Sequence, residues 1–136
     1  PNRTLLELGE KDPVLEKVEE DFNAYMGLVF EDIARQQIWK LRLPFKPYMV
    51  GGWWSKNVEV DVVALDDEKK KAVLLEVKWR RVSGKEAWRL LSELEVKSKY
   101  LPYPRKYYGL IALGFENREE LEKEGYLVYS IKDLLT

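Results

Sequence analysis

Apolar residues recur at helical spacing through the first third of the chain. Asp12-Pro13 is typical of a helix start, because Asp caps the first free N–H groups and Pro fits the first helical position. This pattern predicts an amphipathic helix that ends at about Leu41, before Pro44. Its apolar stripe drifts around the helix in the second half: Leu15, Val18, Phe22, Met26, Val29 and Ile33, then Phe30, Ala34, Ile38 and Leu41.

The middle of the chain changes to the pattern of β-strands. Phe45–Val50 predicts a first strand, which Pro47 places at an edge or a bulge, and Gly51-Gly52 predicts the turn that follows. The stretch Val58–Trp79 contains two runs rich in β-branched residues, separated by a short charged segment. It predicts an antiparallel hairpin whose turn is centred on Glu68-Lys69.

A second helix and further strands complete the pattern. Ser83 with Glu86 three residues later is typical of a capping box that opens a helix reaching Leu101. The strand–helix–strand unit predicts a right-handed crossover between parallel strands. The fold class is therefore α/β, with a central mixed sheet flanked by helices. The last predicted elements are a buried strand at Tyr107–Phe115, a helix at Arg118–Glu124 after Asn117, a strand at Tyr126–Ser130 and a helical turn at Ile131–Leu135.

The amino-acid composition limits the kinds of catalytic site that the chain can form. With 46% hydrophobic and 35% charged residues, the chain is expected to be one soluble globular domain over residues 1–136, without a membrane span. Cys and His are both absent, which excludes disulfides, zinc fingers, thiol nucleophiles and Ser-His-Asp triads. Catalysis must then use carboxylates, Lys, Tyr or a metal held by oxygen. The lack of Cys fits a cytoplasmic protein, and heavy Lys and Glu usage favours a thermophilic source.

Three polar side chains interrupt the apolar runs of the predicted hairpin: Asp61 in the first strand, and Glu76 and Lys78 in the second. The register set by the turn places Asp61 opposite Glu76. Facing carboxylates repel unless something neutralises them, and a divalent cation such as Mg²⁺ or Mn²⁺ is the usual remedy. The alternative is an ordinary solvated strand face, because this short pattern occurs by chance in charged sequences.

Two further features bear on the candidate site. Glu31 lies at the border of the drifted helical stripe, where the small residues Gly27 and Ala34 would let the helix approach a sheet and turn Glu31 inward. It fits plain helix surface equally well. Residues 78–106 carry nine basic and three acidic side chains, although the whole chain has a net charge of −1. Such a block suits a phosphate backbone, or it simply coats a solvated helix face.

The order of elements, together with Asp61 and Glu76-Val77-Lys78, resembles the PD-(D/E)xK nuclease superfamily, which has a restriction-endonuclease-like core. Gly27–Glu31 resembles the acidic position on the first helix of that core, whereas Val60 replaces the Pro of the motif. More closely, GGWWSKNVEVDVVAL followed by LLEVKW is similar to the C-terminal domain of unknown function of archaeal DEXX-box ATPases. This likeness includes the lead-in NRTL at residues 2–5. It implies an ATPase module upstream in the same polypeptide, in keeping with a first residue that is not Met.

The resemblance implies metal-dependent hydrolysis of phosphodiester bonds, with DNA favoured as substrate. Asp61 and Glu76, with the backbone carbonyl of Val77, would hold Mg²⁺ or Mn²⁺. Lys78 would orient the attacking water, and Glu31 would complete the coordination or position a second ion. A non-catalytic module that binds DNA or regulates an ATPase and a protein-docking domain are the alternatives, and a homodimer is compatible with each. The basic block would supply phosphate contacts from Lys85, Arg89, Lys97, Lys99, Arg80 and Arg81.

Overall fold

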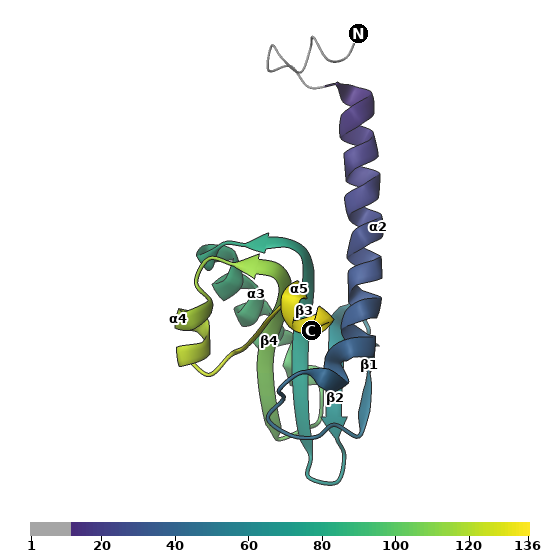
Figure 1. Cartoon of the computed structure of the whole chain (residues 1–136). Coiled ribbons are helices and arrows are strands. Elements are labelled where there is room, and N and C mark those ends of the chain that lie inside the picture. Colours follow the sequence, from purple (N-terminus) through teal and green to yellow (C-terminus); the bar gives the residue numbers. More distant parts are fainter. Residues whose placement is uncertain (1–11) are drawn as a thin grey trace.

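A five-stranded mixed sheet forms the middle layer of the structure (Figure 1). The computed structural model describes residues 12–136. The first three strands are antiparallel neighbours, whereas the third, fourth and fifth run parallel, which confirms the predicted mixed sheet. The strands lie side by side in chain order: β1 (Met49–Ser55), β2 (Val58–Asp66), β3 (Lys71–Val82), β4 (Arg105–Phe115) and β5 (Leu127–Ser130).

Helices cover both faces of this sheet. The α-helices are α2 (Pro13–Gln37), α3 (Gly84–Lys97), α4 (Arg118–Lys123) and α5 (Ile131–Leu135), with short 3₁₀ segments η1 (Ile38–Lys40) and η2 (Ser98–Tyr100). α2 and α5 contribute Phe30, Ala34 and Leu134 to the apolar core on one face. α3 and α4 contribute Leu90 and Leu121 to the core on the other face. The result is a three-layered α/β domain in which α3 provides the predicted crossover between β3 and β4.

The β2–β3 hairpin has the predicted register. Val62 pairs with Leu75, as expected for a turn centred on Glu68-Lys69. The backbone ladder between the two strands ends at this pair, and the next residue on each strand is Asp61 or Glu76. The register therefore brings the two predicted carboxylates to the open end of the hairpin.

The predicted first strand is wrong in its boundaries. β1 begins at Met49 rather than Phe45, and it runs through Gly51-Gly52, where a turn was expected. Pro47 keeps the preceding segment out of the ladder, since proline has no N–H to donate. The glycines lie at a register irregularity of the β1–β2 pair, and the turn comes at Lys56, whose φ is 55°.

Helix α2 is buried in its C-terminal half and exposed in its N-terminal half. Asp12 caps it as predicted, with a carboxylate oxygen that accepts the N–H of Val14 at 2.9 Å. Phe30 and Ala34 are fully buried against the sheet. The predicted apolar stripe thus forms core only in its drifted second half. The other half projects beyond the sheet (Figure 1), and its large apolar side chains are exposed: Val14, Leu15, Val18, Phe22, Tyr25 and Leu28.

The predicted start of α3 is confirmed only in part. The Ser83 hydroxyl accepts the N–H of Glu86 at 3.2 Å, which is one half of the expected capping box. The Glu86 carboxylate, however, is turned toward Arg80 and Arg89, with which it forms ion pairs. The helix also ends before Leu101, which is buried in the segment after η2.

Smaller differences concern the ends of elements. The α-helical part of α2 stops at Gln37, and η1 continues it nearly to the predicted end at Leu41. The chain reverses after α4 at Gly125, whose φ of 93° favours glycine. The predicted lead-in and the likeness at residues 2–5 lie outside the described residues. Within the described range, no helix combines the length and the apolar character needed to cross a bilayer.

Candidate active site

Asp61 and Glu76 lie just beyond the last backbone pair of the β2–β3 hairpin. There the Asp61 carboxylate binds the neighbouring strand directly, because its Oδ2 accepts the N–H of Val77 at 2.8 Å. Glu76 exposes only 7% of its surface although it carries a carboxylate. The residues before it on β3, Leu74 and Leu75, are fully buried. Glu76 is therefore a charged side chain buried among core residues of β3, since Val77 after it is buried too.

The two carboxylates are close enough to influence each other. Burial raises the pKa of Glu76 to about 7, the charge of Asp61 adds to this rise, and Lys97 and Lys78 oppose it. Burial also raises the pKa of Asp61, although the hydrogen bond from Val77 acts in the opposite direction. A carboxyl group that titrates near neutral pH is typical of functional sites, where like charges are held together in a desolvated setting.

Lys97, at the end of α3, reaches the buried carboxylate of Glu76. Its Nζ lies 3.5 Å from Glu76 Oε1, and 31% of the Lys97 side chain is exposed. The sequence predicted Lys97 as a phosphate contact on the surface of the basic block. The structure instead places its charge against a carboxylate of the candidate site, where a cation favours the ionised form.

A hollow of about 690 Å³ opens between α2 and β3, and Val77 lines it, whereas Asp61 and Glu76 do not. Glu31 lines it from the helix, and Lys78 and Arg80 line it from the strand. Gly27 also lines it, and a Cβ added to this glycine would meet no atom within 4 Å. The prediction that small residues bring the helix close to the sheet is therefore wrong at Gly27, where open space lies, and confirmed at Ala34, which is fully buried in the core.

Glu31 is held at the edge of the site by Arg35, one turn further along α2. Arg35 Nη1 lies 3.6 Å from Glu31 Oε1 and donates to the backbone carbonyl of Asp61 at 2.9 Å. Arg35 Nη2 also pairs with Asp32 at 2.7 Å. Burial and the charge of Asp61 raise the pKa of Glu31, while Arg35 lowers it. Glu31 is thus linked electrostatically to Asp61 across the gap between helix and sheet.

The predicted phosphate contacts fall into two groups. Lys85 and Lys99 are exposed, and neither forms an ion pair with any residue in the range 12–136. The other four already have partners, which compete with phosphate for their charge. These pairs are Arg80 with Glu86, Arg89 with Glu86 and Glu93, Lys97 with Glu76, and Arg81 with the backbone carbonyl of Phe115.

The residues present fit a divalent ion as a two-carboxylate site. Mg²⁺ is commonly held through one or two carboxylates while it keeps several waters, and Asp61 and Glu76 supply two. The Lys97 ammonium against Glu76 shows that the position attracts positive charge. Among residues 12–136, no group of three or more Asp or Glu side chains is arranged to hold a metal, so Glu31 acts on the pair at longer range.

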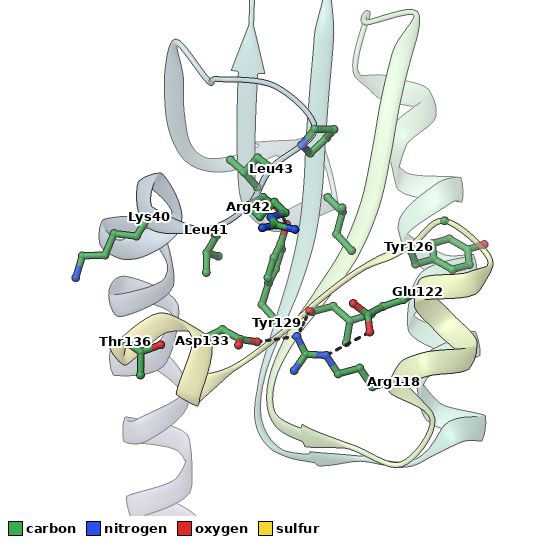
Figure 2. Close-up of a pocket in the computed structure, with 14 residues that line it drawn as sticks. Lys40, Leu41, Arg42, Leu43, Arg118, Glu122, Tyr126, Tyr129, Asp133 and Thr136 are labelled. Carbon is green, nitrogen blue, oxygen red and sulfur yellow. Dashed lines mark hydrogen bonds and ion pairs between the residues drawn. The ribbon is translucent and has the colours of Figure 1, made fainter.

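A larger hollow, of about 790 Å³, lies elsewhere, over β5 and α5 (Figure 2). Two of its carboxylates pair with one guanidinium, since Arg118 lies 2.8 Å from Asp133 and 3.6 Å from Glu122. Arg118 also donates to the backbone carbonyl of Val128 at 2.9 Å, and the Tyr129 hydroxyl donates to the carbonyl of Arg42. These groups satisfy one another, and none of the predicted site residues lines this hollow. Its size alone therefore does not make it the reactive site.

Sequence reasoning missed Arg35 and the contact that Lys97 makes with Glu76. Arg35 was detectable in principle, because it follows Glu31 at the i,i+4 spacing that favours helical ion pairs. The contact of Lys97 with Glu76 had no local signal, since 21 residues and a crossover separate the two.

Two solved structures share this fold. A repair endonuclease from Pyrococcus abyssi superimposes with a TM-score of 0.52 at 20% identity, covering 73% of this chain and 43% of its own. The apo form of EndoMS gives a TM-score of 0.50 at 21% identity, covering 79% of this chain and 45% of its own. The chain thus shares the α/β fold of these endonucleases.

Sequence comparison gives the family. The model of DUF234, described as "Archaea bacterial proteins of unknown function", matches residues 1–90, and the chain belongs to this family. An uncharacterized protein of Methanocaldococcus jannaschii is 34% identical over 125 residues, which cover 88% of this chain. The chain spans only 28% of the length of that relative.

Proposed function

We propose that this domain hydrolyses phosphodiester bonds of DNA at a PD-(D/E)xK-type site that uses Mg²⁺ or Mn²⁺. The observation that carries the proposal is the pair of carboxylates Asp61 and Glu76, which burial and mutual repulsion disfavour in their charged forms. Such a pair is expected where function requires it, because a scaffold position would be more stable with apolar residues. The fold shared with a repair endonuclease supports the same chemistry.

Each residue of the site has a role in this mechanism. Asp61, Glu76 and the backbone carbonyl of Val77 would hold the ion. When bound, the metal supplies a Lewis acid for the scissile phosphate and lowers the pKa of the attacking water. Lys78 orients that water and stabilises the negative charge that develops on the phosphate oxygens. Glu31, which lines the hollow from α2, would move closer to complete the coordination or would position a second ion.

A nucleic acid is the proposed substrate because the basic block lies next to the site in sequence and extends over α3, and DNA is favoured through the resemblance to PD-(D/E)xK nucleases. Lys85 and Lys99 are free to contact phosphates, and Lys97 joins them when it leaves Glu76. The guanidinium groups of Arg80, Arg81 and Arg89 would exchange their present partners for phosphate oxygens. These contacts are independent of base sequence and should weaken with salt.

The proposal extends to the context of the domain. Residues 1–136 would form a single nuclease-like domain of a longer cytoplasmic polypeptide, as a C-terminal partner of an archaeal ATPase module. The relative from Methanocaldococcus jannaschii supports only the longer polypeptide, because the chain matches 28% of its length. A homodimer is compatible with the same arrangement.

A non-catalytic module that binds DNA or regulates the ATPase is the second candidate. The observation in its favour is that residues 12–136 contain no three-carboxylate metal cluster. It predicts salt-dependent DNA binding without cleavage.

The test is Mn²⁺-dependent cleavage of supercoiled, linear and branched DNA. Wild type should cleave at least one of these substrates, and chelation of the metal should stop it. Glu76→Gln should lower the rate by about 100-fold or more, since it removes one ligand and its charge. Glu68→Gln, in the exposed turn of the same hairpin, is the matched control and should cleave as wild type does. Equal cleavage by Glu76→Gln would rule out this site, and binding without cleavage by wild type would favour the non-catalytic module.

A further inference from the structure

The positive charge that contacts Glu76 in the candidate metal site is the ammonium group of Lys97. Lys97 Nζ lies 3.5 Å from Glu76 Oε1, and Glu76 is almost completely buried. Of the six basic residues predicted to contact phosphate, this is the one that reaches a carboxylate of the metal site. An ion pair inside the proposed metal site is a competitor for the metal, because both need the charged form of Glu76.

We propose that Lys97 is the resident counter-cation of the metal-free site and that a divalent ion must displace its ammonium from Glu76 in order to bind. This inference rests on the proposed function, since it describes how the same site takes up its metal. It adds a positioning role for a residue on α3 that lies outside the D…E-x-K pattern on the strands. Binding of the metal would then release Lys97.

The contact between Lys97 and Glu76 has the geometry of an ion pair that a metal ion can displace. A separation of 3.5 Å between Nζ and Oε1 is longer than a strong charged hydrogen bond. The Lys97 side chain is 31% exposed, and a lysine ammonium on its flexible four-carbon stem moves at low cost. In the described residues Lys97 has no other hydrogen-bond or ion-pair partner, so no second contact holds it in place.

Charge balance gives the reason for such a residue. Without a metal, Asp61 and Glu76 are two like charges at the edge of the core, and the Lys97 charge acts favourably on both. With a divalent ion bound, the same ammonium would face a like charge and would be repelled. Lys97 thus offsets one of the two negative charges in the metal-free site, whereas a divalent ion would balance both.

Calorimetric titration with Mn²⁺ tests the inference. Lys97→Met keeps the length of the side chain and removes its charge, and Lys123→Met, on the exposed end of α4, removes the same charge elsewhere. A buffer of about pH 8.5 keeps most Glu76 carboxylates ionised, so that protons compete less with the metal. Lys97→Met should bind Mn²⁺ roughly tenfold more tightly than wild type, or better, and Lys123→Met should bind as wild type does.

The possible outcomes separate this inference from the proposed function. Mn²⁺ binding by wild type with equal or weaker binding by Lys97→Met overturns the displacement of Lys97 and leaves the metal site standing. Binding by Lys97→Met alone supports displacement in its strongest form. Absence of binding in every variant removes the metal site, and the inference with it.

A second measurement uses the wild-type chain and does not depend on the folding of a variant. Lysine acetylation followed by mass spectrometry reports how accessible each ammonium is. Saturating Mn²⁺ should increase the labelling rate of Lys97 several-fold and leave that of Lys123 unchanged. If Mn²⁺ binds and the labelling of Lys97 does not increase, its ammonium stays on Glu76 and the inference is wrong.

Discussion

The β2–β3 hairpin has an apolar half near its turn and a charged half at its open end. In the apolar half, Val62 pairs with Leu75, and both are fully buried. In the charged half, Asp61 and Glu76 are largely withdrawn from water too, and burial raises the pKa of each. Burial of the first pair stabilises the fold, whereas burial of the second costs free energy whenever the carboxylates are ionised without a counter-ion. One pair of strands thus supports the fold at one end and carries the candidate chemistry at the other.

Truncation in the apolar half should have the largest effect on stability. Leu75→Ala is expected to lower the free energy of unfolding by about 3 kcal/mol, because it leaves a cavity in a fully buried position. Urea unfolding with and without Mn²⁺ measures this loss. The loss should be the same in both conditions, and a loss that Mn²⁺ reverses would break the distinction between the two halves.

The charged half should make the metal-free protein less stable as the pH rises. The pKa of Glu76 is about 7 in the fold and 4.5 in the reference state, so the folded state binds the proton more tightly. This stabilisation is complete below about pH 4.5 and is lost as the pH rises through about 7. Protonation of Glu76 contributes up to about 3 kcal/mol to the free energy of unfolding.

Glu76→Gln removes this titration and provides the control. Without metal, the variant should show a flatter pH profile and should be more stable than wild type at about pH 8. Chemical unfolding across the range from about pH 5 to pH 8 measures both curves. Parallel curves for the two proteins would show that Glu76 does not titrate in this range.

Two substitutions of Asp61 should change the stability of the metal-free protein by different amounts, and this difference should be smaller than the effects above. Asp61→Asn removes the charge and keeps an oxygen that accepts the N–H of Val77, whereas Asp61→Ala leaves this N–H without its partner. The Ala variant should therefore be less stable than the Asn variant by about 1–2 kcal/mol. Equal stabilities, measured by urea unfolding without metal, would mean that the hydrogen bond is not important for the fold.

Removal of the Lys78 charge should have the smallest effect on stability. Lys78→Ala removes a half-buried cation that acts favourably on both carboxylates, and it is expected to cost less than about 1 kcal/mol in the metal-free protein. Lys69→Ala, in the exposed turn of the same hairpin, is the matched control and should be neutral. A gain in stability for Lys78→Ala would contradict the view that Lys78 offsets the negative charge of Asp61 and Glu76.

Local patterns in the sequence determined much of this fold. Asp12-Pro13 marks the start of α2, and the β-branched runs around Glu68-Lys69 predict both the hairpin and its register. These features depend on neighbours along the chain, namely caps, turns and the alternation of side chains on a strand. The mixed sheet and its parallel crossover followed from the order of the elements, because connections of this kind have a fixed handedness.

Other features of the sequence misled where the tertiary context prevailed. The apolar stripe of α2 is continuous along the helix, yet the sheet reaches only its second half, so Phe22 is exposed while Phe30 is buried. Gly51-Gly52 has the composition of a turn, but pairing with β2 holds it in an extended strand. Periodicity shows which residues share a face, and it does not show whether anything packs against that face.

The sequence by itself placed Asp61 and Glu76 at the open end of one hairpin, because register follows from turn position and alternation. Only the tertiary structure decided which cations meet them. Arg35 reaches the backbone carbonyl of Asp61 from a helix 26 residues away, and Lys97 reaches Glu76 from the end of the crossover helix. The physical reason is that ion pairs between distant segments depend on how the helices pack across the sheet, and long charged side chains have no periodic signature that reveals their partner.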